Sequence, residues 1–250
     1  MEFAYIQILS TLLYCTSFLC WLFKRFRAAV VLLGCGFIAN VLALAMRGYI
    51  DSHFYLALVA EDELYVLPIV LAGIALYHFT RRAELDGVFV LAPLVFTSLI
   101  ALLSFTEPGL PSAKINIWVA PAFFLIETLS AGLIFASAGL SLGALLLHKG
   151  HKDALTERYI LGAFVLFSIS QILGALWAYL GWSYPFSWSN RHLASASVWC
   201  LYAGLIHSHL VGMRPKTTAI LASLGALPML LVIYHHQLSP LLLAGVGHHP

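Results

Sequence analysis

Long apolar runs separated by few charges constrain this chain most strongly. Eight such runs cover residues 3–23, 28–46, 64–80, 87–105, 117–147, 159–181, 193–212 and 217–236. About 20 mostly apolar residues are enough for a helix to cross a bilayer. Only 10% of the residues are charged, against about a quarter in a soluble domain, so lipid must cover most of the surface. The sequence therefore predicts one all-α polytopic membrane domain over residues 1–250, with about eight transmembrane helices.

The basic residues predict the orientation of this bundle, because cytoplasmic loops are enriched in Lys and Arg. If the N-terminus faces outward, three basic residues fall on the outer side, namely Arg47, Lys114 and Arg191. The inner side then carries the others: Lys24, Arg25, Arg27, Arg81, Arg82, Lys149, Lys152, Arg158, Arg214 and Lys216. We therefore expect both termini to lie outside.

The same composition excludes an ordinary cytosolic enzyme, a nucleic-acid binder and a disordered chain. The four cysteines lie inside apolar runs, and no Cys-x-x-Cys-His spacing for covalent haem attachment is present. The sequence shows no nucleophile–base pair, phosphate-binding glycine loop or metal-hydrolase cluster, so we expect no independent enzymatic activity. The N-terminal run is expected to be a first span rather than a signal peptide.

A tryptophan-rich stretch between the sixth and seventh runs indicates a function. It reads GALWAYLGWSYPFSWSNRHLASASVWCLYAGLIH over residues 174–207. This stretch resembles the haem-handling segment of the cytochrome c assembly protein family, of the CcsA, ResC, CcmC and HemX type. In that family a tryptophan-rich outer loop lies between two spans, and the second span ends in W-x-x-Y-x-x-x-L-H. Aligned without gaps, the matching residues are Trp177, Trp182, Trp188, Trp199, Tyr202 and His207, with Arg191 in place of a lysine.

The resemblance implies a haem site beside the tryptophan loop, which covers about residues 181–192. Indole rings provide a dry platform for a porphyrin face, and histidines are axial ligands that haem iron prefers. Arg191 can meet a propionate through charge-assisted hydrogen bonds, and His192 is a further candidate ligand. A plain aromatic belt at the membrane interface is the alternative for the tryptophans.

Two further segments resemble the same family, so that the resemblance covers roughly residues 35–250 and leaves the first span outside. Arg47, His53 and Glu61 match one family stretch, and Gly247-His248-His249 resembles a terminal motif whose histidine binds haem iron. By resemblance, His207 and His248 are the expected iron ligands, with His249 beside them. The pair His235 and His236 is a rival to that terminal pair.

Several residues depart from the family pattern. Its haem-binding histidines come in pairs, and Asn40 and Phe123 stand near the positions of two partner histidines. Phe186 replaces one loop tryptophan. These departures favour an alternative, a degenerate member without haem that serves as a structural or regulatory subunit of a membrane complex. A haem-bearing electron-transfer subunit is a third possibility.

Glu127 is the most unusual residue of the fifth run. A charge at the centre of a span costs roughly 2.5–3.5 kcal/mol on insertion scales, so this carboxyl must be protonated, paired or beside a polar cavity. One helical turn separates it from Phe123, which places both on one face. It either serves proton handling or ligand contact, or bonds a hydroxyl such as Thr128, Ser168 or Ser170.

The leading hypothesis is therefore a haem-handling membrane protein of the cytochrome c biogenesis type, which holds or transports non-covalent b-type haem. The resemblance further implies a bacterial cytoplasmic membrane or a thylakoid, ResB-like or other membrane partners, and c-type cytochromes. The acidic residues 61–63 are a solvated loop or a docking site for such a basic partner.

Overall fold

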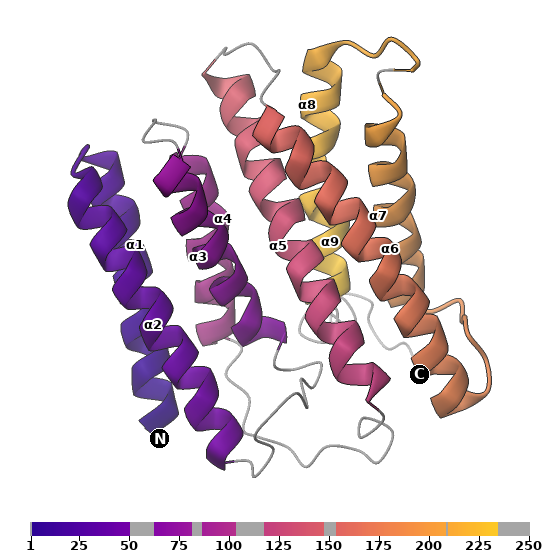
Figure 1. Cartoon of the computed structure of the whole chain (residues 1–250), viewed down its shortest axis with the longest axis horizontal. Helices are drawn as coiled ribbons and strands as arrows, with labels where there is room; N and C mark the ends of the chain where they lie inside the picture. The colour runs from indigo at the N-terminus through magenta and orange to yellow at the C-terminus, as the bar shows by residue number, and fades with distance from the viewer. Residues whose placement is uncertain are drawn as a thin grey trace, which may run out of the picture.

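The computed structural model describes residues 2–50, 63–81, 87–103, 118–147, 154–208 and 210–234. Across these ranges the chain is helical, and no strand occurs in them (Figure 1). The helices are α1 (Glu2–Leu22), α2 (Phe26–Ile50), α3 (Glu63–Arg81), α4 (Gly87–Leu103), α5 (Val119–Leu146), α6 (Ala154–Trp182), α7 (Asn190–Ile206), α8 (Pro215–Leu224) and α9 (Ala226–Ile233). The predicted all-α polytopic membrane fold is confirmed.

Each predicted span corresponds to a helix or to a pair of helices. Five segments are long and apolar enough to cross a membrane: Ala4–Leu22, Phe26–Gly48, Val119–Leu146, Ala154–Trp182 and Pro215–Ile233. The helices α3, α4 and α7 have 19, 17 and 17 residues, and the apolar parts of α3 and α4 are the shorter segments Leu64–Thr80 and Gly87–Leu103. At 1.5 Å per residue they reach about 25–28 Å, close to the thickness of the hydrocarbon core.

The last predicted span, 217–236, differs from the structure because it is interrupted at Gly225. Pro228 has no N–H and cannot donate to the carbonyl four residues earlier, which weakens the helix at this point. A Cβ at Gly225 would lie 2.9 Å from the ring of Tyr202, so glycine lets α7 approach closely here. The run therefore folds as α8 followed by α9.

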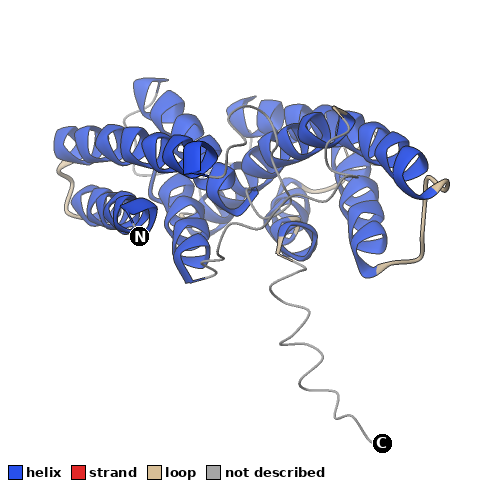
Figure 2. Ribbon diagram, turned by 90° about the horizontal axis from the view of Figure 1, so that it is seen from below, coloured by secondary structure: helices blue, strands red, loops and turns tan. Residues whose placement is uncertain are grey.

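Helices α1 to α7 and the α8–α9 pair run alternately in opposite directions, and their ends gather at two ends of the bundle. Figure 1 shows the N-terminus and the α6–α7 loop at the lower end, and the α1–α2 turn with Lys24 and Arg25 at the upper end. Seen from below in Figure 2, the first helical hairpin and the α6–α7 loop lie at opposite sides of an elongated molecule. This alternation agrees with the predicted topology. Which end faces outward stays a prediction.

Helix α5 is the centre of the bundle and contacts α3, α4, α6, α8 and α9. Its small residues allow this close packing. A Cβ on Gly132 would lie 2.4 Å from Val70 of α3, and one on Gly143 would lie 2.5 Å from the ring of Phe89 of α4. The most restricted position is Gly139, because a Cβ there would lie 2.0 Å from the carbonyl oxygen of Phe89.

We expect Gly139→Ala to destabilise the protein by about 1–3 kcal/mol, since overpacking against a backbone atom forces α4 and α5 apart. The matched control is Gly73→Ala on α3, where a Cβ meets nothing within 4 Å. That change replaces glycine by a better helix former and should be neutral or stabilising. Thermal unfolding in mild detergent measures both. Equal midpoints for the two variants would contradict the packing described for Gly139.

Candidate functional site: an aromatic pocket between α6 and α7

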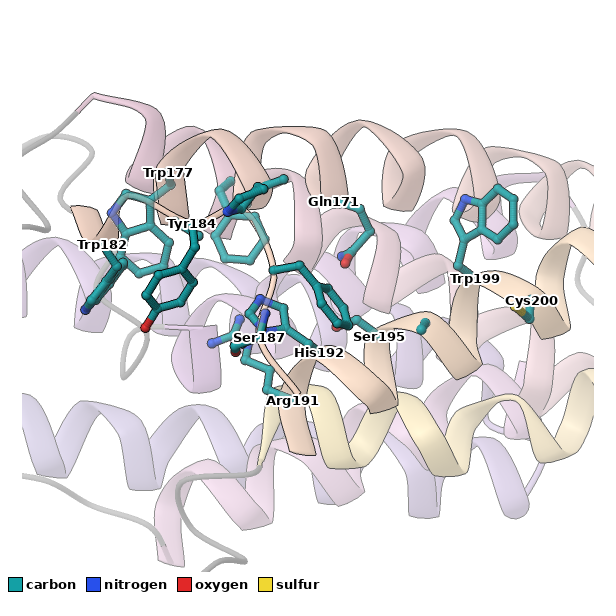
Figure 3. A pocket seen from close by; sticks show the side chains of 17 residues that line it. Gln171, Trp177, Trp182, Tyr184, Ser187, Arg191, His192, Ser195, Trp199 and Cys200 are labelled. Atoms are coloured by element: carbon teal, nitrogen blue, oxygen red, sulfur yellow. Dashed lines mark hydrogen bonds between the residues drawn. The ribbon is translucent and has the colours of Figure 1, made fainter. Parts of the chain in front are cut away.

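A pocket of about 540 Å³ lies between α6, α7 and the loop that joins them (Figure 3). Helix α6 contributes Gln171, Gly174, Ala175, Trp177, Ala178 and Trp182. Helix α7 contributes Arg191, His192, Ser195, Ala196, Trp199 and Cys200. These positions recur at intervals of three or four residues, so each helix presents one face to the pocket. Phe123 of α5 completes the wall.

The loop between the two helices is fixed by local backbone chemistry. The Ser183 N–H donates to the carbonyl oxygen of Tyr179 at 2.8 Å, and Ser183 adopts a left-handed conformation with φ 65°. This residue turns the chain out of α6. At the other end Ser189 caps α7, because its side-chain oxygen accepts from the His192 N–H. Tyr184, Pro185, Phe186 and Ser187 between these points line the pocket.

Three of the four predicted platform tryptophans line the pocket, and the fourth does not. The Trp177 ring stacks on Phe123 with centroids 5.9 Å apart, and the edge of Trp182 meets Trp177 at 5.3 Å. Trp199 lines the far end of the pocket and donates from Nε1 to Ser168 Oγ at 3.0 Å. Trp188 lies outside the lining and is 83% exposed. The structure thus separates the three tryptophans that line the pocket from Trp188, which does not.

Arg191 and Glu127 form an ion pair that joins α7 to α5. Arg191 Nη2 donates to Glu127 Oε2 at 2.5 Å; the glutamate side chain is fully buried and the arginine side chain is 19% exposed. The guanidinium carbon also lies 5.4 Å and 5.6 Å from the ring centroids of Phe123 and Phe124. The charge of the arginine therefore offsets that of the buried carboxylate beside the pocket.

This pair settles one alternative for Glu127, the predicted bond to a neighbouring hydroxyl. Among the three hydroxyls named for that role, each donates to a carbonyl on its own helix: Thr128 to Phe124, Ser168 to Phe164 and Ser170 to Phe167. The hydroxyl hypothesis was therefore wrong, because a serine or threonine within a helix reaches the carbonyl of the preceding turn more readily than a neighbouring helix.

His192 lines the pocket and is held by the loop. The Ser187 N–H donates to His192 Nδ1 at 3.3 Å, and Ser187 Oγ lies 2.7 Å from the same nitrogen. A ring nitrogen that accepts from a backbone N–H carries no proton, so the neutral imidazole is protonated at Nε2. Burial, and next the positive charge of Arg191, lower the pKa of His192. The ring is therefore a neutral hydrogen-bond donor at pH 7.

The remaining predicted ligands lie either away from the pocket or outside the described residues. His207 is the C-cap of α7, with Nδ1 2.8 Å from the carbonyl oxygen of Ala203. It lies 15 residues from His192, about 22 Å along the helix, so the structure does not bring it to the pocket. His53, Glu61, Asp62, the pair His235 and His236, and the pair His248 and His249 lie outside the described residues.

Phe123 and Asn40, which stand near the positions of two family histidines, lie in different parts of the structure. Phe123 lines the pocket, and its ring packs over Gly174, where a Cβ would lie 2.9 Å away. Asn40 is buried between α1 and α2, where its Nδ2 donates to the Tyr14 hydroxyl at 3.4 Å. Phe123 is therefore at the site, whereas Asn40 belongs to a separate hydrogen bond in the first hairpin.

Several lining residues are not among the sequence predictions, notably Gln171, Tyr184, Ser195 and Cys200. The sequence does contain a signal for the two helical faces. Gln171 precedes Trp182 on α6, and Ser195 and Cys200 follow His192 on α7, each at helical spacing. The pattern that begins at these two predicted residues could therefore have been extended along both helices. The tyrosine in the loop carries no such periodic signal.

In its described part the chain is thus an all-helical polytopic membrane bundle with an aromatic pocket of ligand size at one end. The family follows from comparison with known proteins. The model of the family described as "Cytochrome C assembly protein" matches residues 5–243, and the chain belongs to that family. The match confirms the resemblance and corrects its extent, because it includes the first span, which the sequence comparison had left outside.

Individual relatives match over shorter stretches. The chain is 34% identical over 84 residues to the cytochrome c biogenesis protein CcsA of Prochlorococcus marinus (strain AS9601), covering 33% of this chain and 27% of the relative. It is 36% identical over 74 residues to the CcsA of Thermosynechococcus vestitus (strain NIES-2133 / IAM M-273 / BP-1), covering 29% and 23%. The aligned stretch thus spans about a quarter of each of these relatives.

Proposed function

We propose that this protein handles haem during cytochrome c biogenesis and holds it in the α6–α7 pocket. The observation that carries the proposal is the pocket itself, in which aromatic side chains and a guanidinium face one cavity of about 540 Å³ in a chain of the cytochrome c assembly family. Pockets for small molecules measure about 300–1,000 Å³ and are mostly apolar with a few placed polar groups. A porphyrin with carboxylates on one edge matches this chemistry.

The residues present fit a porphyrin in two respects. Trp177, Trp182 and Phe123 offer flat apolar surfaces against which a ring can pack. Arg191, fixed by Glu127, offers a cation that can bind a propionate by a charge-assisted hydrogen bond. His192 Nε2 is a second donor for a carboxylate. Haem would be bound without a covalent link, since the sequence has no Cys-x-x-Cys-His motif.

The iron ligands are assigned by family resemblance and not from contacts in the pocket. An axial histidine usually donates from one ring nitrogen and binds the metal with the other, whereas His192 accepts at Nδ1. We therefore assign His192 to the carboxylates. By family resemblance His248, with His249 beside it, stays the proposed iron ligand, whereas His207, about 22 Å along α7 from His192, is too far to bind the iron of haem in this pocket. The proposed setting is a bacterial cytoplasmic membrane or a thylakoid, in a complex with ResB-like subunits that serves c-type cytochromes.

We expect Trp182→Ala to weaken haem binding about threefold to tenfold, because an aromatic pair contributes about 0.5–1.5 kcal/mol beyond its buried area. The matched control is Trp188→Ala, which removes an exposed tryptophan of the same loop that lies outside the pocket lining. Titration of the purified chain in detergent with ferric haem, followed by the Soret band, gives both affinities. Equal losses would place the ligand on the loop surface instead of in the pocket.

A second candidate is a haem-free structural subunit of a membrane complex. It is favoured by Phe123, which brings a phenyl ring to the pocket wall where the family carries a partner histidine. The same titration separates the two functions. An unmodified chain that binds neither ferric haem nor metal-free porphyrin would replace the leading proposal by this one.

A further inference from the structure

The pocket extends well beyond the tryptophan loop and follows the groove between α6 and α7. In Figure 3 the side chains of Trp177, Trp182 and Tyr184 gather at one end, and those of Trp199 and Cys200 lie at the other. Arg191 and Cys200 are nine residues apart on α7, about 14 Å at 1.5 Å per residue. The cavity therefore runs along the helix axes, from the loop into the depth of the predicted bilayer.

The two ends of this groove differ in charge. Arg191 and His192 stand at the loop end, and the buried partner Glu127 fixes the guanidinium there. Trp199 and Cys200 form the deep end, where the described lining contains no cationic side chain. Both residues are also exposed on the outer face of the bundle, so this end of the groove faces lipid in a membrane.

We propose that the bound tetrapyrrole lies lengthwise in the groove, with its carboxylates at Arg191 and its apolar edge inserted between α6 and α7 as far as Cys200. This inference rests on the proposed function and adds the orientation and depth of the ligand. The reverse orientation would bring two carboxylates into the bilayer away from Arg191, and each intramembrane charge costs roughly 2.5–3.5 kcal/mol. The charge of the groove thus selects one orientation.

Cys200 is a built-in reporter of this arrangement. It is a free, exposed cysteine at the deep end of the pocket. Cys35 on α2 is also free and exposed, and it lies outside the pocket lining. Each is more than one helical turn from either end of its helix. The two thiols are therefore a matched pair, one expected to be covered by the ligand and one not.

The experiment measures alkylation of the detergent-purified full chain by N-ethylmaleimide, with and without metal-free protoporphyrin IX, and quantifies each cysteine by peptide mass spectrometry. At a porphyrin concentration about ten times Kd, roughly nine-tenths of the sites are filled, so we expect alkylation of Cys200 to slow about tenfold. Cys35 should react at an unchanged rate. Porphyrin fluorescence, recorded in parallel, reports binding independently of the thiols.

A pair of variants tests the depth without relying on the thiol. Ala196→Phe fills the groove from α7, and we expect it to weaken porphyrin binding at least about tenfold. Ser197→Phe, one position further along on an exposed face outside the lining, should leave binding unchanged. Porphyrin that binds while Cys200 reacts at its original rate would overturn the lengthwise orientation and leave the proposed function standing. A chain that binds ferric haem but not the metal-free ring would also overturn this inference, and only a chain that binds neither would refute the proposed function.

Discussion

Arg191→Met is expected to destabilise the folded chain by about 3–5 kcal/mol, because removing one partner of a buried ion pair leaves the other charge uncompensated. Glu127 is fully buried, and its Oε1 makes no hydrogen bond within the described part of the chain. Its Oε2 accepts from Arg191. The variant would therefore leave a carboxylate inside the bundle without the cation that offsets it.

The measurement for Arg191→Met is unfolding of the purified chain in mild detergent, with Arg27→Met as the control. Arg27 is exposed near the start of α2, at the opposite end of the bundle, and its replacement should change stability by less than about 0.5 kcal/mol. The double variant Glu127→Leu/Arg191→Met removes both charges and should recover much of the loss. If the double variant loses as much stability as Arg191→Met and Glu127→Leu lose together, the two residues act independently.

The positions of the spans could be predicted from the sequence because the thickness of a bilayer fixes the length of a helix. α1, α2, α4 and α7 begin and end within six residues of the predicted spans 3–23, 28–46, 87–105 and 193–212. The interruption at Gly225 could not be predicted in this way. It coincides with Pro228, which lacks an N–H, and with the close approach of Tyr202 to Gly225, and hydropathy records neither.

The site was predicted in its composition and not in its geometry. Trp177, Trp182 and Arg191 were selected by resemblance and His192 by its place beside the tryptophan loop, and all four line one pocket. The pairing of Arg191 with Glu127 escaped prediction because 64 residues separate them and no local pattern links two helices at that distance. Trp188 was assigned to the same platform because sequence spacing does not say which face of a loop turns toward the pocket.

Phe123→His is expected to raise the affinity for ferric haem by at least about tenfold. Phe123 lines the pocket on α5, and by resemblance the family carries a haem-binding histidine near this position. The change would add a nitrogen ligand to a wall that now offers a phenyl ring. Histidine is an axial ligand that haem iron prefers, and a tenfold rise in affinity requires only about 1.4 kcal/mol.

The control for Phe123→His is Phe123→Leu, which removes the same ring and its contact with Trp177 without supplying nitrogen. Metal-free protoporphyrin IX separates ligation from packing, because it presents the same ring and carboxylates but no iron. If the histidine binds iron, only the affinity for haem rises and the Soret maximum shifts, whereas both variants bind the metal-free ring equally. An equal change for haem and for the metal-free ring would mean that the α5 wall does not face the iron. The role of Phe123 would then be to support Trp177 and Arg191, both of which lie against its ring.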